Sequence, residues 1–220
     1  MSEILGKIEK PEATQFQSGR KLFFVPLIIT PPEENEHIAN LANKYWNEAT
    51  EQIRNLEAKL SPIKRIYHEL LPNRENLQQL KVMNVGSYSI MKAFMADDIV
   101  INEIEDSELM REFLDWNLCL SLQLQSQKVF NKVYEAFQEI TQKRNEHIAK
   151  RIDETLENDE SAVLFMREGH HVQFSSDIQI FYIAPPTLDT LKRALHEQQA
   201  NILKREQEDN NHEHHKEAAS

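Results

Sequence analysis

Apolar residues along the chain fall into short continuous runs that alternate with longer amphipathic stretches. The runs 22–30, 161–167 and 177–184 have the length of β-strands and are apolar at most positions. This pattern is typical of strands that are buried on both faces of a sheet. Two further segments, 63–69 and 99–106, have mixed or partly alternating polarity. We expect these segments to be strands as well.

Three of the stretches between these runs have the spacing of amphipathic helices. Segment 33–60 carries apolar residues three and four positions apart, which predicts one long helix. A second helix is predicted over 75–97, with Gly86 as a weak point inside it, and a third over 187–204. The alternation of strands and helices predicts an α/β fold in which helices cover a small, mainly parallel sheet.

The middle of the chain is predicted to be helical, because no glycine or proline occurs between Gly86 and Gly169. The helical pattern covers 107–157, and one straight helix of that length would extend about 75 Å. A compact domain of this size is only about 45 Å across. The polar segment 121–128 suits a turn and predicts a hairpin of two antiparallel helices. The alternative is a helix that projects as a dimerisation arm.

Two further features bear on the boundaries of the fold. Pro26 interrupts the first apolar run and cannot donate a hydrogen bond to a neighbouring strand, which predicts a sheet edge or a bulge there. From about position 205 to 220 the chain is charged, poor in apolar residues and rich in histidine. Such a composition predicts a disordered tail, so that a single domain is expected over 1–204.

The charge and the apolar content exclude some classes of partner. The formal charge of -11 provides no attraction for the phosphates of nucleic acid or for an anionic membrane. No apolar run reaches the roughly 18 residues that a membrane-spanning helix needs. The first residues, 1–7, lack the basic and apolar regions of a signal peptide. We therefore expect a cytoplasmic protein that binds neither nucleic acid nor membrane.

One charged residue lies on the apolar face of the long helical segment. Arg144 occupies a position of the apolar seam between Ile140 and Ile148. A buried guanidinium costs several kcal/mol unless a carboxylate pairs with it. Glu103 and Glu105, at the end of the strand 99–106, are the natural partners in the predicted topology. The alternative is an arginine at the edge of the helix whose guanidinium extends into water.

A pair of histidines follows the strand 161–167. Gly169 permits a left-handed backbone directly before His170 and His171. An imidazole at such a strand end can serve as a general base near neutral pH or as a metal ligand. Neighbouring residues of an extended chain point in opposite directions, so we select His170 as the candidate. A surface turn that contains two histidines is the alternative.

A second strand, 63–69, also ends in polar residues. His68 and Glu69 follow its apolar part and could join Glu105 and His171 as ligands of a divalent cation. Nitrogen and carboxylate ligands without thiolates suit zinc or manganese. The chain contains no HExxH motif, no phosphate-binding loop, no dinucleotide fingerprint and no GxSxG motif. The metal site is therefore expected only as an assembly of residues across the fold.

The order of these residues resembles that of a known group. Glu103 at a strand end, Arg144-Asn145-x-x-Ile148-Ala149 on a helix, an apolar strand and then Gly169-His170 are similar to the pattern of TraB-like proteins and their erythromycin-esterase-like relatives. The resemblance covers about 99–182. It implies a hydrolytic, often metal-assisted, site in which Glu103, Arg144 and His170 are the catalytic residues.

The chain departs from the pattern of that group at two places. The group has a Gly-x-x-His motif at the end of its first strand, whereas the run 22–30 contains no histidine. The late motif of the group also reads Gly-x-x-His, and Arg167 or Glu168 stands here in place of the glycine.

The sequence thus leaves two functions open. The first is a hydrolase-like protein that acts on a small molecule or a peptide. The second is a non-enzymatic protein whose long helices pair with another copy or with another chain through the apolar seam 109–156.

Overall fold

The computed structural model describes residues 18–30, 35–95 and 99–217, and it describes only the backbone at 74, 203 and 205–217. Within these residues, five parallel strands form one sheet in the order β3-β2-β4-β1-β5. The strands are β1 Arg20–Pro26, β2 Ile63–His68, β3 Val100–Asn102, β4 Ser161–Met166 and β5 Ile178–Tyr182. The helices are α1 Glu36–Lys59, α2 Leu77–Met83, α3 Val85–Phe94, α4 Ser107–Ser121, α5 Gln127–Thr155 and α6 Thr187–Glu217, with a 3-10 turn η2 at Arg74–Asn76. This architecture confirms the α/β class.

Alternate residues of the central strands enter two separate cores. In β1, Phe23 and Val25 belong to the core that α1, α3 and α6 cover, whereas Leu22 and Phe24 face the opposite side. The opposite core receives Ile148 and other apolar residues from the C-terminal half of α5. A parallel strand with helices on both faces is apolar at every position, and this explains the unbroken run in the sequence.

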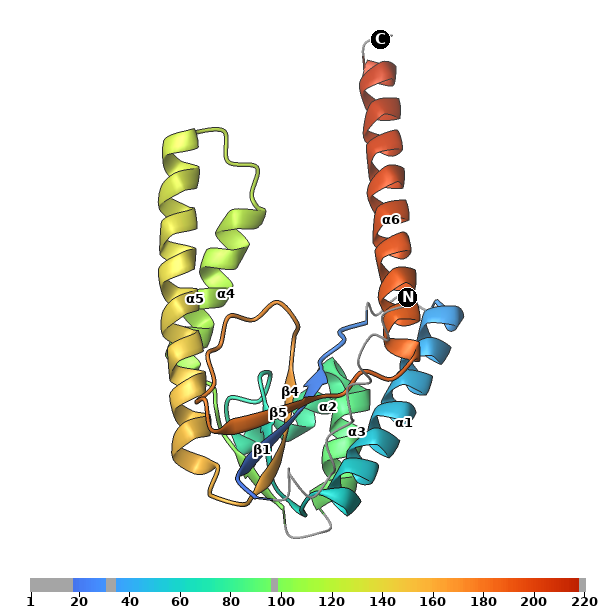
Figure 1. Ribbon diagram of the computed structural model, residues 1–220. Coiled ribbons are helices and arrows are strands. Elements are labelled where there is room, and N and C mark those ends of the chain that lie inside the picture. The colour runs from blue at the N-terminus through green and yellow to red at the C-terminus, as the bar shows by residue number, and fades with distance from the viewer. Residues whose placement is uncertain (1–17, 31–34, 96–98, 218–220) are drawn as a thin grey trace, which may run out of the picture.

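The helical segment in the middle of the chain is broken into two helices, and these project beyond the sheet. α4 ends at Ser121, α5 begins at Gln127, and the two helices pack against each other as a hairpin. Figure 1 shows the hairpin extending well beyond the sheet. The hairpin is the one that the polar segment 121–128 predicted. Its base, formed by the second half of α5, covers the sheet, and its tip does not.

Three predictions about the elements require correction. Pro26 marks neither an edge nor a bulge, because β1 lies between β4 and β5 and its register with β4 is regular through Pro26. Pro26 is the last residue of β1, beyond the last β1–β5 pair, Phe24 with Tyr182. The helix predicted over 75–97 is divided into η2, α2 and α3, with the break at Asn84. The last helix does not end at 204, because α6 continues to Glu217 through the segment predicted to be disordered.

The break at Asn84 has a visible cause. The Asn84 side chain accepts a hydrogen bond from the backbone N–H of Ser87 at 2.9 Å and donates one to the carbonyl of Ile28 at 2.7 Å. The first of these bonds caps the start of α3. Gly86 packs against the indole of Trp46, at a position where any side chain would collide with the ring. The break and the glycine therefore let α3 approach α1 closely.

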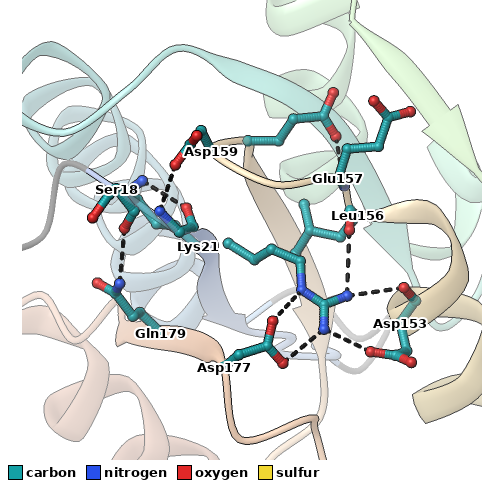
Figure 2. Close-up of polar contacts among 11 residues, drawn as sticks. Ser18, Lys21, Asp153, Leu156, Glu157, Asp159, Asp177 and Gln179 are labelled. Atoms are coloured by element: carbon teal, nitrogen blue, oxygen red, sulfur yellow. Dashed lines mark hydrogen bonds and ion pairs between the residues drawn. The ribbon is translucent and has the colours of Figure 1, made fainter.

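An arginine clamp holds the amino ends of the strands (Figure 2). The guanidinium of Arg20, the first residue of β1, donates to both carboxylate oxygens of Asp177, at 2.7 and 2.8 Å. It also donates to the carboxylate of Asp153 at 2.7 Å and to the carbonyl of Leu156 at 3.3 Å. The clamp joins β1 to the end of α5 and to the loop before β5.

The part of the chain that the structure describes contains no helix with the length and apolar character needed to cross a membrane. The N-terminal residues 1–7 and the prolines at 31 and 32, like residues 218–220 of the tail, lie outside the described residues.

Candidate functional site

Arg144 and Glu105 form a buried ion pair at the carboxyl end of the sheet. Nε of Arg144 donates to Oε2 of Glu105 at 2.9 Å, and a second guanidinium nitrogen donates to Oε1 of the same carboxylate. Arg144 is 7% exposed and Glu105 is 6% exposed. The carboxylate partner that the apolar seam predicted is therefore present, and the alternative of a guanidinium in water does not hold.

Glu103 does not take part in this pair. It is exposed, and its backbone carbonyl accepts a hydrogen bond from Arg151 at 3.4 Å. The strand β3 ends at Asn102, and the chain then turns so that Ile104 and Glu105 are buried. Of the two glutamates considered from the sequence, the structure places only Glu105 beside Arg144.

A second carboxylate approaches Arg144 from the neighbouring strand. Oε2 of Glu69, directly after β2, lies 3.8 Å from the guanidinium of Arg144. Oε1 of Glu69 accepts hydrogen bonds from the backbone N–H and from Nε of Arg167, at 3.1 and 2.7 Å. The four residues thus form a chain of alternating charge, Glu105–Arg144–Glu69–Arg167. We call this chain the charged cluster.

Burial differs along the charged cluster. The side chains of Glu105, Glu69 and Arg144 are 0, 3 and 8% exposed, whereas that of Arg167 is 45% exposed. Burial raises the pKa of Glu105, although the hydrogen bond and the charge of Arg144 oppose this shift. Arg144 also lies over the ring of Phe113 from α4, 4.9 Å from its centre. The exposed end of the cluster is therefore Arg167, which can meet a ligand.

His170 lies beside the charged cluster in a defined tautomer. Gly169 before it has a φ of +78°, a left-handed conformation that glycine adopts without strain. Nδ1 of His170 accepts a hydrogen bond from the backbone N–H of Val172 at 3.2 Å, so the proton of the neutral ring is on Nε2. Burial lowers the pKa of His170, against the opposing charge of Glu69. At neutral pH His170 is therefore a hydrogen-bond donor through Nε2.

One cavity unites these side chains. Its volume is about 300 Å³, and Glu69, Arg144, Arg167, His170 and His171 all line it. A larger hollow of about 610 Å³ adjoins it along α5 and shares His171 with it. Of the three residues expected to be catalytic, Arg144 and His170 line this cavity and Glu103 does not, whereas Glu69 lines it as well.

His68 has a structural position instead of one at the cavity. Nδ1 of His68 accepts a hydrogen bond from the backbone N–H of Leu70 at 3.0 Å, and Nε2 lies 3.0 Å from Oγ of Ser87. The ring packs on Phe165 in the core. Burial lowers the pKa of His68 to about 3. Both ring nitrogens are occupied within the protein, so His68 is not available as a metal ligand.

The residues proposed from the sequence as metal ligands do not fit a divalent cation. The carboxylates of Glu69 and Glu105 are held by the guanidinium groups of Arg167 and Arg144, which supply the positive charge of the site. Within the described ranges, no three histidine, cysteine or acidic residues are placed to hold a metal ion. His171 lines the cavity from an exposed position but does not complete such a group.

The sequence did not reveal the contribution of Arg167. Glu69 and Arg167 each come directly after a strand, and β2 and β4 are adjacent and parallel, with His68 paired to Phe165. The two side chains therefore lie next to each other at the carboxyl end of the sheet. The available signal was a charged residue immediately after each buried strand, but strand order was needed to place the two side by side.

A comparison of the chain with models of protein families, with curated proteins and with solved structures finds no match.

Proposed function

We propose that the protein is a hydrolase-like enzyme whose site is the cavity formed by the charged cluster and His170. The observation that carries the proposal is the position of Glu69. Its Oε1 is held by Arg167, while its side chain lines the same cavity as the donor His170. A carboxylate that is held in place and lines a cavity is suited to removing a proton from water.

In the proposed reaction, Glu69 takes a proton from a water molecule, and the oxygen of that water attacks the carbonyl carbon of an ester or amide. The negative charge that develops on the carbonyl oxygen is stabilised by Nε2–H of His170 and by the guanidinium of Arg167. The bond to the leaving group then breaks, and the leaving group receives the proton from Glu69. Arg144 and Glu105 are positioning residues that hold Glu69 in place.

The resemblance to TraB-like proteins points in the same direction. It implies that Arg144 and His170 belong to a hydrolytic site, and both lie at the cavity. It implies a catalytic role for Glu103 as well, but the exposed position of Glu103 favours Glu69 in that role. The proposed reaction uses only side chains of the protein.

Hydrolysis of an activated ester, 1-naphthyl acetate, tests the proposal. The His170→Ala variant removes a donor to the carbonyl oxygen and is expected to lower kcat/KM about 10²- to 10³-fold. His196→Ala is the matched control, because His196 is exposed on α6, and its kcat/KM should equal that of the wild type. Equal rates for all three proteins would contradict the proposal.

A second candidate function is self-association through the tip of the α4–α5 hairpin. None of the residues of α4 is buried. The exposed large apolar residues of the hairpin are Leu114, Leu118, Leu122, Val129, Phe130 and Tyr134. A group of exposed apolar residues on one hairpin is typical of a surface that contacts another protein.

The charges of the hairpin favour a second copy as the partner. On α4, Glu112 and Asp115 are exposed beside the apolar residues, and on the first turns of α5 Lys128 and Lys132 are exposed. In a two-fold arrangement the acidic side of α4 in one copy can face the basic start of α5 in the other. We propose a dimer that the hairpin tips form, and this dimer is compatible with the hydrolytic site.

A further inference from the structure

The face of the sheet that α5 covers is left open near β5. In the core on this side, the helical residues that the structure describes come from α5, and of β5 only Ile178 is part of this core. β5 is an edge strand, and on it Ile180 and Tyr182 are each 48% exposed. A hollow of about 520 Å³ lies here. This volume is within the range of small-molecule pockets.

Aromatic rings form the wall of this hollow. The ring of Phe24 stacks on that of Tyr182, with centres 5.5 Å apart and planes at 11°. The imidazole of His170 contacts the rings of Phe24 and Phe174, with ring centres 5.1 and 5.7 Å apart. Val172 and Ile180 complete the apolar lining. Flat apolar groups can stack on such a surface.

The charged residues at the rim are paired with one another. The hydroxyl of Tyr182 donates to a carboxylate oxygen of Glu168, and Lys192 forms an ion pair with the other oxygen. Among the described residues that line the hollow, no further side chain is acidic or basic except the imidazole of His170. A charged ligand would lose its hydration here without gaining a partner, so the hollow suits an uncharged apolar group.

His170 connects this hollow to the proposed catalytic cavity, because it lines both. A substrate whose carbonyl oxygen accepts from Nε2 of His170 has one side next to Phe24 and Phe174. Its other side faces Glu69 and Arg167. We propose that the hollow is a subsite for the aromatic or branched apolar part of the substrate, so that the preferred substrates are uncharged esters or amides with an aryl group. This inference rests on the proposed hydrolytic function.

Binding of 1-naphthol tests the subsite without any need for catalysis. The Ile180→Glu variant places a charge in the wall, and we expect it to weaken binding of 1-naphthol, measured by calorimetry, at least about tenfold. Val100→Glu is the matched control, because Val100 is an exposed apolar residue of the opposite edge strand β3. Thermal melts of both variants should match the wild type. Equal binding of 1-naphthol by all three proteins, or no binding to the wild type, would overturn the inference.

Hydrolysis separates failure of the subsite from failure of the catalytic proposal. If 1-naphthol binds as expected but 1-naphthyl acetate is not hydrolysed, the subsite stands as a binding site and the proposed enzyme fails. If the ester is hydrolysed but Ile180→Glu leaves KM unchanged, the enzyme stands and the subsite fails. We expect a raised KM for Ile180→Glu and an unchanged KM for Val100→Glu.

Discussion

Arg144 of α5 and Glu105 beyond β3 are joined by two hydrogen bonds in the core, although they lie 39 positions apart in the chain. The pair joins the base of the hairpin to the carboxyl edge of the sheet. Because Glu69 also lies 3.8 Å from the same guanidinium, Arg144 compensates the charge of two buried carboxylates. Glu69 therefore lies between this pair and Arg167.

Replacement of Arg144 should be strongly destabilising. Arg144→Met leaves Glu105 buried without a compensating charge and removes one of the two arginines beside Glu69, and we expect the free energy of unfolding in urea to fall by about 3–5 kcal/mol. The double variant Arg144→Met with Glu105→Gln should recover part of this loss, since the unpaired charge of Glu105 is then removed. Lys143→Met, which breaks an exposed pair with Glu139 on the same helix, should change stability little. A loss for Arg144→Met as small as that of Lys143→Met would show that the pair is unimportant for folding.

Stability should decrease in acid because of His68. The pKa of His68 is about 3 in the folded protein and 6.5 as the reference value of an unburied histidine. Between these values the unfolded chain binds a proton that the folded protein does not, so stability falls as the pH falls from 6.5 toward 3. At pH 5 the resulting loss in the free energy of unfolding is about 2 kcal/mol.

Urea unfolding at pH 7 and pH 5 measures this effect. His68→Gln cannot titrate, so its loss of stability between the two pH values should be smaller than that of the wild type by about the same 2 kcal/mol. An identical loss in both proteins would mean that His68 is protonated in the folded state.

The arginine clamp should contribute to stability through geometry as well as charge. Arg20→Ala removes hydrogen bonds to Asp153 and Asp177, and we expect about 2 kcal/mol lower stability in thermal or urea unfolding. Arg20→Lys should restore only part of the lost stability, because an ammonium cannot donate to Asp153 and Asp177 together in the geometry of the planar guanidinium. Arg193→Lys, an exposed substitution on α6, serves as the control. Full recovery by Arg20→Lys would contradict the geometric part of the argument.

The hairpin tip should determine the oligomeric state. Light scattering at micromolar concentration is expected to give the mass of a dimer for the wild type and that of a monomer for Leu118→Glu, because the substitution places a charge in the apolar surface. Val82→Glu, at an exposed apolar position of α2 outside the hairpin, should remain a dimer. A monomeric wild type would exclude this association.

The elements of the fold could be predicted because local patterns specify them. The apolar run before Pro26 and the spacing of apolar residues along α1 each reflect which faces of these elements are buried. The polar segment 121–128 contains the turn between α4 and α5. The edge position of Pro26 was predicted wrongly because a single proline cannot distinguish an edge from the last residue of a central strand. Strand order depends on contacts between distant segments, which no local pattern contains.

The site could be predicted only in part for the same reason. Arg144 was recognisable because it interrupts an apolar seam, and this required a buried carboxylate. The choice between Glu103 and Glu105 depended on where β3 ends, which differs by a few residues from the predicted strand. Glu69 and Arg167 became neighbours only through the adjacency of β2 and β4.

The most direct test of the central claim is the kcat/KM of Glu69→Gln and Glu103→Gln for 1-naphthyl acetate at neutral pH. Glutamine keeps the shape of Glu69 and an oxygen that accepts from Arg167, but it cannot take a proton from water. We predict a fall of about 10²- to 10⁴-fold for Glu69→Gln and a value equal to that of the wild type for Glu103→Gln. Wild-type activity in a folded Glu69→Gln variant would contradict the account.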